Sequence, residues 1–188
     1  MKFSCIREKL SRIITHADRF TCKNITLPAL GNLLFEFNDN SLIITGTNLE
    51  QAFIGKISGS GVGKGLLMVP SKVVSSFLQS LKDEKIDLED KQGSLLVKTA
   101  SHHTKINSIS AQEFPLIPKI KKNNECVLLG SIFSAGVQRV LTAVSTSEFK
   151  PELTGVFIKI TPTAAYIAAT DTFRLAEQTI IFEKRQRK

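Results

Sequence analysis

Apolar and polar positions alternate over residues 27–54, and this pattern predicts a β-hairpin followed by a further strand. Leu33, Phe35 and Phe37 recur at every second position, as on one face of a strand. A polar Asn-Asp-Asn turn comes next, and a second apolar run resumes the strand. A third strand is expected over residues 51–58.

The same pattern returns in residues 153–180. Gly155 lies 124 positions after Gly31, and Asp171 lies 123 positions after Asn48. Both copies contain a glycine, an apolar strand, a turn, a second strand, a Thr-Asn or Thr-Asp corner and another strand. A repeat of this length is far longer than solenoid periods and indicates duplicated, domain-sized modules.

Three segments carry apolar residues at helical spacing, over residues 6–20, 70–81 and 131–144. Arg12 and Arg139 are expected away from the apolar stripes. The residues expected to face inward are Ile6, Leu10, Ile13, Ile14 and Ala17 in the first helix, Val73, Val74, Phe77, Leu78 and Leu81 in the second, and Phe133, Val137, Val140, Leu141 and Val144 in the third.

Each predicted helix follows a short strand, over residues 1–5, 66–69 and 127–129, and precedes three more strands. The chain therefore contains three copies of a strand-helix-three-strand unit. This order predicts an α+β fold with helices on one face of antiparallel sheets. We expect a first domain of two units over residues 1–118, a linker over residues 119–124, and half of a second domain over residues 125–188.

The glycine-rich segment 59–65 has the wrong spacing for a phosphate-binding loop. Three residues separate Gly59 from Gly63, where such a loop needs four, and a strand rather than a helix follows Gly65. The dinucleotide-binding pattern also fails, because Leu66 occupies its last glycine position. We interpret this segment as a flexible hairpin tip.

The composition of the 188 residues, 42% hydrophobic with interspersed charge, is that of a soluble globular protein. There is no apolar run of membrane-spanning length and no signal-peptide core at the N-terminus, so we expect a cytoplasmic protein without membrane partners. Cys5, Cys22 and Cys126 are scattered with no CxxC pair. Buried thiols are therefore expected rather than disulfides or a zinc site.

The formal net charge of +8 favours polyanionic partners, although nucleic acid, anionic lipid and simple solubility all remain open on charge alone. No catalytic set is apparent. His16 stands alone, and His102 and His103 are adjacent on a predicted strand and so face opposite sides. We expect a protein that is not an enzyme and needs no metal or cofactor.

Six short sequence words, in order along nearly the whole chain, resemble the bacterial sliding clamp, the beta subunit of DNA polymerase III. They are MKF at the start, TLPALGNLL at 26–34, TGTNLE at 45–50, VP at 69–70, EFP at 113–115 and ATDxxRLA at 169–176. The resemblance implies three two-unit domains per subunit and a head-to-tail homodimer that closes around DNA. On that basis the chain holds the first domain and half of the second, and the third is absent.

The resemblance also implies a function, that of a DNA replication processivity factor. Its expected partners are double-stranded DNA of any sequence, the catalytic subunit of DNA polymerase III, the clamp loader, and other clamp-binding replication and repair proteins. The alternative is a stand-alone, truncated clamp-like protein that binds DNA or acts as a scaffold without closing a ring.

Helices with basic residues would line the central hole and contact phosphates weakly. The family places a basic DNA contact two residues before T-L-P, where this chain has Asn24, and a glutamine contact where it has Ser147. The residues expected at DNA are Arg12, Lys23, Asn24, Lys72, Arg139 and Ser147.

The family binds short peptides of its partners in an apolar groove between its second and third domains. One wall is expected to contain Leu153, Thr170, Phe173, Arg174 and Leu175, with Phe173 in place of the usual histidine. Phe77 and Ile106 fall where the first domain meets the third domain of the next subunit, and we expect both to be exposed in this chain or covered by a neighbouring molecule in a crystal.

Overall fold

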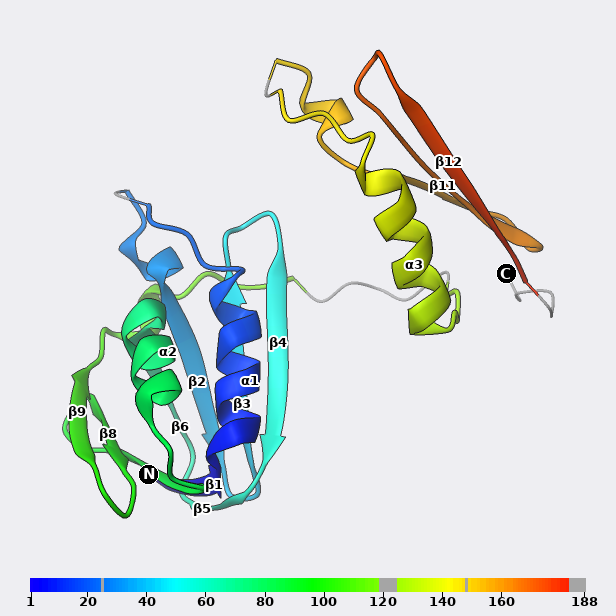
Figure 1. Cartoon of the computed structure of the whole chain (residues 1–188). Coiled ribbons are helices and arrows are strands. Elements are labelled where there is room, and N and C mark those ends of the chain that lie inside the picture. Colours follow the sequence, from blue (N-terminus) through cyan, green and yellow to red (C-terminus); the bar gives the residue numbers. More distant parts are fainter. Residues whose placement is uncertain (25, 119–124, 148, 183–188) are drawn as a thin grey trace. The chain divides into compact units, whose positions relative to one another are not determined.

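The computed structural model describes residues 1–24, 26–118, 125–147 and 149–182 (Figure 1). The chain divides into two compact units, residues 1–118 and 119–188, which we call unit 1 and unit 2. The linker expected over residues 119–124 lies outside the described residues. None of the helices in the described ranges is long and apolar enough to cross a membrane.

Unit 1 consists of two antiparallel sheets and two α-helices. One sheet has the strand order β4-β3-β2-β6, and the other has the order β5-β1-β7-β8-β9. The elements are β1 (Lys2–Ile6), α1 (Arg7–Asp18), β2 (Asn32–Asn38), β3 (Ser41–Thr47), β4 (Ala52–Ser58), β5 (Ser60–Val62), β6 (Gly65–Pro70), α2 (Ser71–Ser80), β7 (Lys85–Asp90), β8 (Ser94–Lys98) and β9 (His103–Asn107), with short 3-10 helices at Pro28–Gly31 and Ala111–Glu113.

The two helices pack beside each other and cover one side of these sheets (Figure 1). Leu10, Ile14 and Ala17 of α1 are fully buried, as their spacing of three and four residues predicts. From β2, Phe35 and Phe37 enter the same core. The strands therefore turn an apolar face toward the helices and their other face away from them.

The two repeats within unit 1 exchange their first strands. The first strand of the second repeat, β6, pairs with β2 of the first repeat. Reciprocally, β1 of the first repeat pairs with β7 of the second. Each repeat therefore completes the sheet of the other, and the domain is a pair of interlocked repeats.

Unit 2 contains one further repeat, with a three-stranded antiparallel sheet in the order β10-β11-β12. Helix α3 packs on β11 and β12 (Figure 1). The bounds of α3, β11 and β12 lie 123 positions after those of α1, β3 and β4. The elements are α3 (Gly130–Leu141), a 3-10 helix (Pro151–Leu153), β10 (Phe157–Ile160), β11 (Ala164–Thr170) and β12 (Leu175–Ile181).

The predicted α+β class, with helices on one face of antiparallel sheets, is confirmed, but the strand expected over residues 127–129 is wrong. These residues lie outside any strand. The corresponding strand β1 is held by β7, which belongs to the other repeat of unit 1. The described part of unit 2 holds a single repeat, so no counterpart of β7 is among its described residues.

Three side chains that we expected to face inward are exposed instead. Val73 is 51% exposed and Leu141 is 50% exposed. The buried stripe of α2 contains Val74 and Leu78, and Val73 lies about 100° away from it around the helix. Ile6 closes β1 before the helix begins, and it alternates away from the buried Cys5.

Part of the glycine-rich segment is a strand rather than a hairpin tip. Residues 60–62 form β5, which pairs with β1. A Cβ atom on Gly61 would lie 2.8 Å from the carbonyl oxygen of Lys2, so the glycine allows the two backbones to approach closely. Structural packing therefore accounts for this part of the segment.

The cysteines only partly follow the expectation of buried thiols. Cys5 is buried in the core, where loss of solvent and the neighbouring Asp87 carboxylate raise the pKa of its thiol to about 12. Cys22 and Cys126 are half-buried, and all three are free thiols.

Candidate functional site

The three α-helices carry more basic than acidic side chains. Helices α2 and α3 contain one basic residue each and no acidic residue, whereas α1 contains both kinds. The basic residues are Arg7, Lys9, Arg12, Lys72 and Arg139, and the acidic ones are Glu8 and Asp18. This excess gives the helices the sign of charge that phosphates attract.

Arg12 and Lys72 both extend into solvent from the helices of unit 1, with side chains that are 70% and 72% exposed. A nitrogen of Arg12 lies 3.7 Å from the Glu8 carboxylate, one turn earlier on α1. The Nζ of Lys72 is much closer to its partner, at 2.7 Å from an oxygen of Asp18, whose other oxygen accepts a hydrogen bond from Ser71. The positive charge of Arg12 is therefore less balanced by a neighbouring carboxylate than that of Lys72.

Lys23 and Asn24 are exposed in the connection between α1 and β2. The side-chain oxygen of Asn24 accepts hydrogen bonds from the backbone N–H groups of Thr26 and Leu27, at 2.8 and 3.0 Å. Asn24 thus builds a local turn, which is a common use of asparagine. Lys23 is the cationic side chain that this turn presents.

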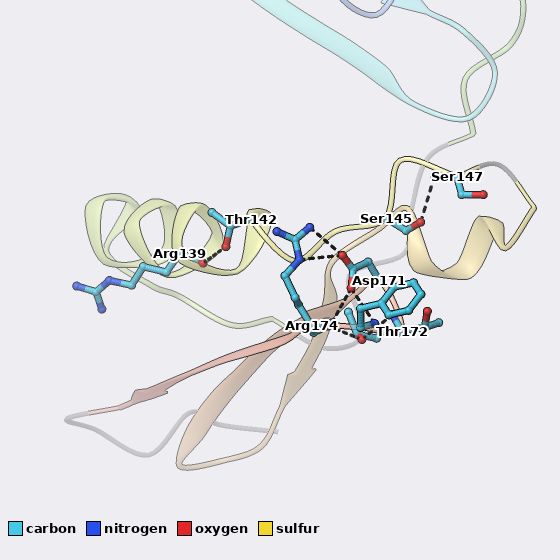
Figure 2. Close-up of polar contacts among 9 residues, drawn as sticks. Arg139, Thr142, Ser145, Ser147, Asp171, Thr172 and Arg174 are labelled. Carbon is cyan, nitrogen blue, oxygen red and sulfur yellow. Dashed lines mark hydrogen bonds and ion pairs between the residues drawn. The ribbon is translucent and has the colours of Figure 1, made fainter.

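Arg139 and Ser147 belong to unit 2. Arg139 donates a hydrogen bond of 2.8 Å to the Gln178 side-chain oxygen on β12, and in Figure 2 it points away from the turn that holds Asp171. Ser147 belongs to a loop, where its backbone N–H donates to the Ser145 hydroxyl at 3.1 Å. The two residues are thus held by different local contacts.

Three of the five expected groove residues line one hollow of about 240 Å³ in unit 2, namely Leu153, Thr170 and Leu175. The hollow also has lining residues that the sequence pattern did not predict, namely Glu152, Gly155, Phe157, Ala168 and Ala169. Phe157 could have been found from the repeat, because it corresponds to the half-buried Leu34. The hollow is bounded by the 3-10 helix and strands β10, β11 and β12.

Phe173 and Arg174, the other two expected groove residues, form the turn between β11 and β12. Phe173 is 95% exposed. The Arg174 guanidinium donates two hydrogen bonds, of 2.9 and 2.8 Å, to one oxygen of Asp171 (Figure 2). These two residues therefore lie at the edge of the hollow and not among its lining side chains.

The Asp171 carboxylate organises this turn. Its other oxygen accepts the backbone N–H groups of Phe173 and Arg174, at 3.0 and 2.7 Å (Figure 2). The backbone N–H of Arg174, followed by its side chain, lowers the pKa of Asp171 from 3.8 to about 2. The aspartate is therefore ionised at neutral pH, and both of its carboxylate oxygens accept hydrogen bonds.

Phe77 and Ile106 were expected to be exposed, and for Ile106 this is wrong. Ile106 is 4% exposed and belongs to the core of unit 1, because β9 turns this residue toward β8 and the helices. Phe77 is half-buried against the same core. Ile106 therefore has a packing role in this chain.

One polar cluster in unit 1 contains Asp83, Ser101 and His102. The Ser101 hydroxyl donates to Asp83 at 2.7 Å and also lies 2.7 Å from the Nδ1 of His102. These bonds hold the pKa of Asp83 below its usual value, with the Ser101 hydroxyl as the largest cause. No group of three or more metal-ligating side chains occurs in the described part of the chain.

Solved structures of sliding clamps share this fold. The DNA polymerase III beta subunit of Thermotoga maritima superposes with a TM-score of 0.90 at 26% identity, covering 98% of this chain and 51% of that one. A sliding clamp of Pseudomonas aeruginosa, solved with bound griselimycin, gives a TM-score of 0.91 at 23% identity, over 99% and 51% of the two chains.

Comparisons of the sequence also find beta sliding clamps. The beta sliding clamp of Synechococcus elongatus is 27% identical over 179 residues, covering 94% of this chain and 48% of the relative. That of Synechocystis is 29% identical over 185 residues, covering 94% and 47%. The chain thus spans about half the length of the curated relatives it matches.

Two family models match the chain in the order in which the domains follow each other. The DNA polymerase III beta subunit N-terminal domain matches residues 1–118, and the central domain of the same subunit matches residues 128–188. Together they account for nearly all of the sequence, and the chain therefore belongs to the DNA polymerase III beta subunit family.

Proposed function

We propose that this chain acts in DNA replication as part of a processivity factor, a sliding clamp that encircles duplex DNA and tethers the replicative polymerase. The observation that carries this proposal is the ordered match to two successive domains of the beta subunit over residues 1–118 and 128–188. We take residues 1–118 as a complete first clamp domain and residues 125–188 as the first half of the second.

The distribution of charge supports a DNA-facing role for the helices. A protein that slides along DNA needs weak contacts to phosphates and no hydrogen bonds to base edges. Exposed cations on helices, such as Arg12 and Lys72, meet this requirement, because long side chains can follow the backbone without reading sequence. We propose that Arg12, Lys23, Lys72 and Arg139 contact phosphates, and that Asn24 and Ser147 also contact DNA.

The hollow in unit 2 supports a second role, that of a receptor for short peptides of replication proteins. Leu153, Phe157 and Leu175 give it apolar walls, and Thr170 contributes a polar edge. Apolar anchors of a peptide gain affinity by filling such a hollow. We propose the polymerase catalytic subunit and the clamp loader as its partners, in the cytoplasm, with no catalytic step on the clamp itself.

A second function needs only the exposed cations of the helices, such as Arg12 and Lys72. A clamp-like protein with this surface binds DNA or serves as a scaffold without closing a ring. The two functions differ in topology. A closed ring stays on a circle and leaves only when the circle is cut, whereas an open protein binds both forms alike through salt-sensitive contacts.

The test is retention of residues 1–188 on nicked circular DNA, with and without a clamp loader, in a high-salt wash. Retention on circles with release after linearisation would support the ring. Because residues 1–188 hold only three repeats, we expect this chain alone to leave circles and linear DNA equally, at a rate that increases with salt. Retention of the chain alone on circles would contradict that expectation.

A further inference from the structure

The last residue of α1 and the first two residues of α2 form one charged contact. One carboxylate oxygen of Asp18 accepts a hydrogen bond from the Ser71 hydroxyl, and the other lies 2.7 Å from the Nζ of Lys72. The two helices lie side by side in unit 1 (Figure 1). The contact therefore belongs to the helices that we propose to face DNA.

The two partners of this ion pair differ in their freedom to move. The Asp18 side chain is only 15% exposed, and the Ser71 that holds it is fully buried. A carboxylate at the start of a helix is also stabilised by the positive end of the helix dipole. The Lys72 side chain, in contrast, extends into solvent. The carboxylate is thus fixed in place, whereas the ammonium group can leave it for another anion.

The other two helical cations proposed to contact DNA have weaker partners. Arg12 lies 3.7 Å from Glu8, whose side chain is as exposed as its own. Arg139 bonds to the neutral amide of Gln178. Among the described residues, neither of these arginines has a shielded carboxylate at hydrogen-bond distance. Lys72 therefore differs from both in the anion that it already holds.

This arrangement makes a phosphate contact of Lys72 an exchange of one anion for another. The ammonium group has to leave Asp18 before it can pair fully with a phosphate, so the free energy of the existing pair is lost. The carboxylate then stays close by without its partner, and it repels the phosphate. Both effects weaken the contact, and weak phosphate contacts are what a protein that slides along DNA needs.

We propose that Asp18 is a positioning residue that weakens the DNA contact of Lys72, because its fixed carboxylate competes with phosphate for the lysine. Asp18 occupies the place of a phosphate on Lys72 in the free protein and gives up the lysine at each contact. This inference rests on the proposed function, since it requires Lys72 to contact DNA. It adds an acidic residue to the proposed interface.

Two substitutions separate the charge of Asp18 from its hydrogen bond to Ser71. Asp18→Asn keeps an acceptor oxygen and removes the charge, whereas Asp18→Ala removes both. Because the charge is what competes, both variants should bind duplex DNA about two- to fivefold more tightly than the wild type. The slope of log affinity against log salt should also steepen, by up to about 1. Fluorescence anisotropy of a labelled duplex measures both quantities.

Thermal unfolding checks that the change in DNA affinity does not come from an altered fold. Asp18→Asn should unfold near the wild-type temperature, because Ser71 keeps an acceptor. Asp18→Ala should unfold at a clearly lower temperature, since the buried hydroxyl then has no such partner. Affinity for DNA should therefore follow the charge at position 18, and stability should follow the hydrogen bond.

A double-mutant cycle tests whether the effect passes through Lys72. In a Lys72→Gln background there is no lysine to release, so Asp18→Asn should change the affinity by less than about 1.5-fold. Glu36→Gln is the control for net charge. Glu36 lies between the buried Phe35 and Phe37 on β2 and so faces away from the helices, and its replacement should leave the affinity unchanged.

Equal gains from Asp18→Asn with and without Lys72 would overturn the inference, because general charge would then explain them. Tighter binding by Asp18→Ala but not by Asp18→Asn would also overturn it, since the hydrogen bond would be the cause. Weaker binding by Lys72→Gln, without any gain from Asp18→Asn, would overturn the inference alone. Unchanged affinity in both variants would contradict the proposed DNA contact of Lys72 as well.

Discussion

Asn48 and Asp171, 123 positions apart, hold the same turn in the two halves of the structure. Each side-chain oxygen accepts hydrogen bonds from the backbone N–H groups two and three residues ahead, at 3.1 and 2.8 Å for Asn48 and at 3.0 and 2.7 Å for Asp171. The residue after each has a left-handed φ, of 76° at Leu49 and 78° at Thr172. The geometry is repeated, and only the charge differs.

The first prediction follows from this substitution of aspartate for asparagine. Asp171→Asn keeps the acceptor oxygen and should leave the turn folded, as Asn48 does in unit 1. Asp171→Ala removes the acceptor and leaves two backbone N–H groups to water. The midpoint of thermal unfolding should therefore be highest for the wild type, lower for Asp171→Asn and lowest for Asp171→Ala. An equal effect of both variants would show that the ion pair with Arg174, and not the turn, is what matters.

The second prediction concerns pH. Because the folded pKa of Asp171 is lowered from 3.8 to about 2, ionisation of this group favours the folded turn above pH 3.8. That contribution is lost as pH falls from 3.8 through about 2. Carboxyl carbon shifts measured by NMR should titrate near pH 2. In Arg174→Ala the pKa should rise but stay below 3.8, since the backbone N–H remains.

Residue periodicity predicted the helices and most strands well. The burial of Leu10, Ile14 and Ala17 follows from their spacing, because one face of α1 packs on two sheets. The repeat was also detectable, since its turn requires an Asn or Asp and a Thr at fixed positions. These requirements are local, so they can be read directly from the sequence.

The pairing between repeats was not predictable in the same way. The failure at residues 127–129 depends on which distant strand lies alongside. The burial of Ile106 depends on which face of the β8–β9 pair packs on the core. An apolar pattern indicates a strand but does not indicate which other strand pairs with it. In the hollow of unit 2, the repeat aligns Phe157 with Leu34, but this alignment does not show that Phe157 borders a hollow.

The third prediction tests whether Ile106 packs in the core of unit 1 or lies on its surface as part of an interface. Ile106→Ala should destabilise the chain by about 2–5 kcal/mol, because the side chain is buried and its loss leaves a cavity. Ile54→Ala is a matched control, since Ile54 is 63% exposed on β4 and should cost less than about 0.5 kcal/mol. Urea unfolding of both variants would measure this. Similar costs for the two would contradict the core position of Ile106.

The fourth prediction tests the helices as the DNA-facing side. Arg12→Gln should reduce the slope of log affinity against log salt for duplex DNA by about 1, as expected for one phosphate contact. Lys72→Gln should reduce it less, because Asp18 already balances part of this charge. Lys56→Gln makes the same charge change on β4, on the face away from α1, and should leave the slope unchanged. Equal effects at all three positions would indicate only a general attraction by net charge.

The last prediction concerns the hollow beside the 3-10 helix. Leu175 is 72% exposed on β12 and lines the hollow together with Leu153 and Phe157, so a peptide that binds there buries it. Leu175→Ala should weaken binding of a short peptide with apolar side chains from the polymerase subunit by about 1.5–3 kcal/mol.

Ile181→Ala provides the matched control for this peptide test. It removes a comparable exposed side chain from the far end of the same strand, outside the hollow, and should leave the peptide affinity unchanged. Fluorescence anisotropy of a labelled peptide would report both values. Because both residues are exposed, neither change should unfold unit 2, so a selective loss with Leu175→Ala would assign the peptide to the hollow. Equal losses would place the peptide elsewhere on β12.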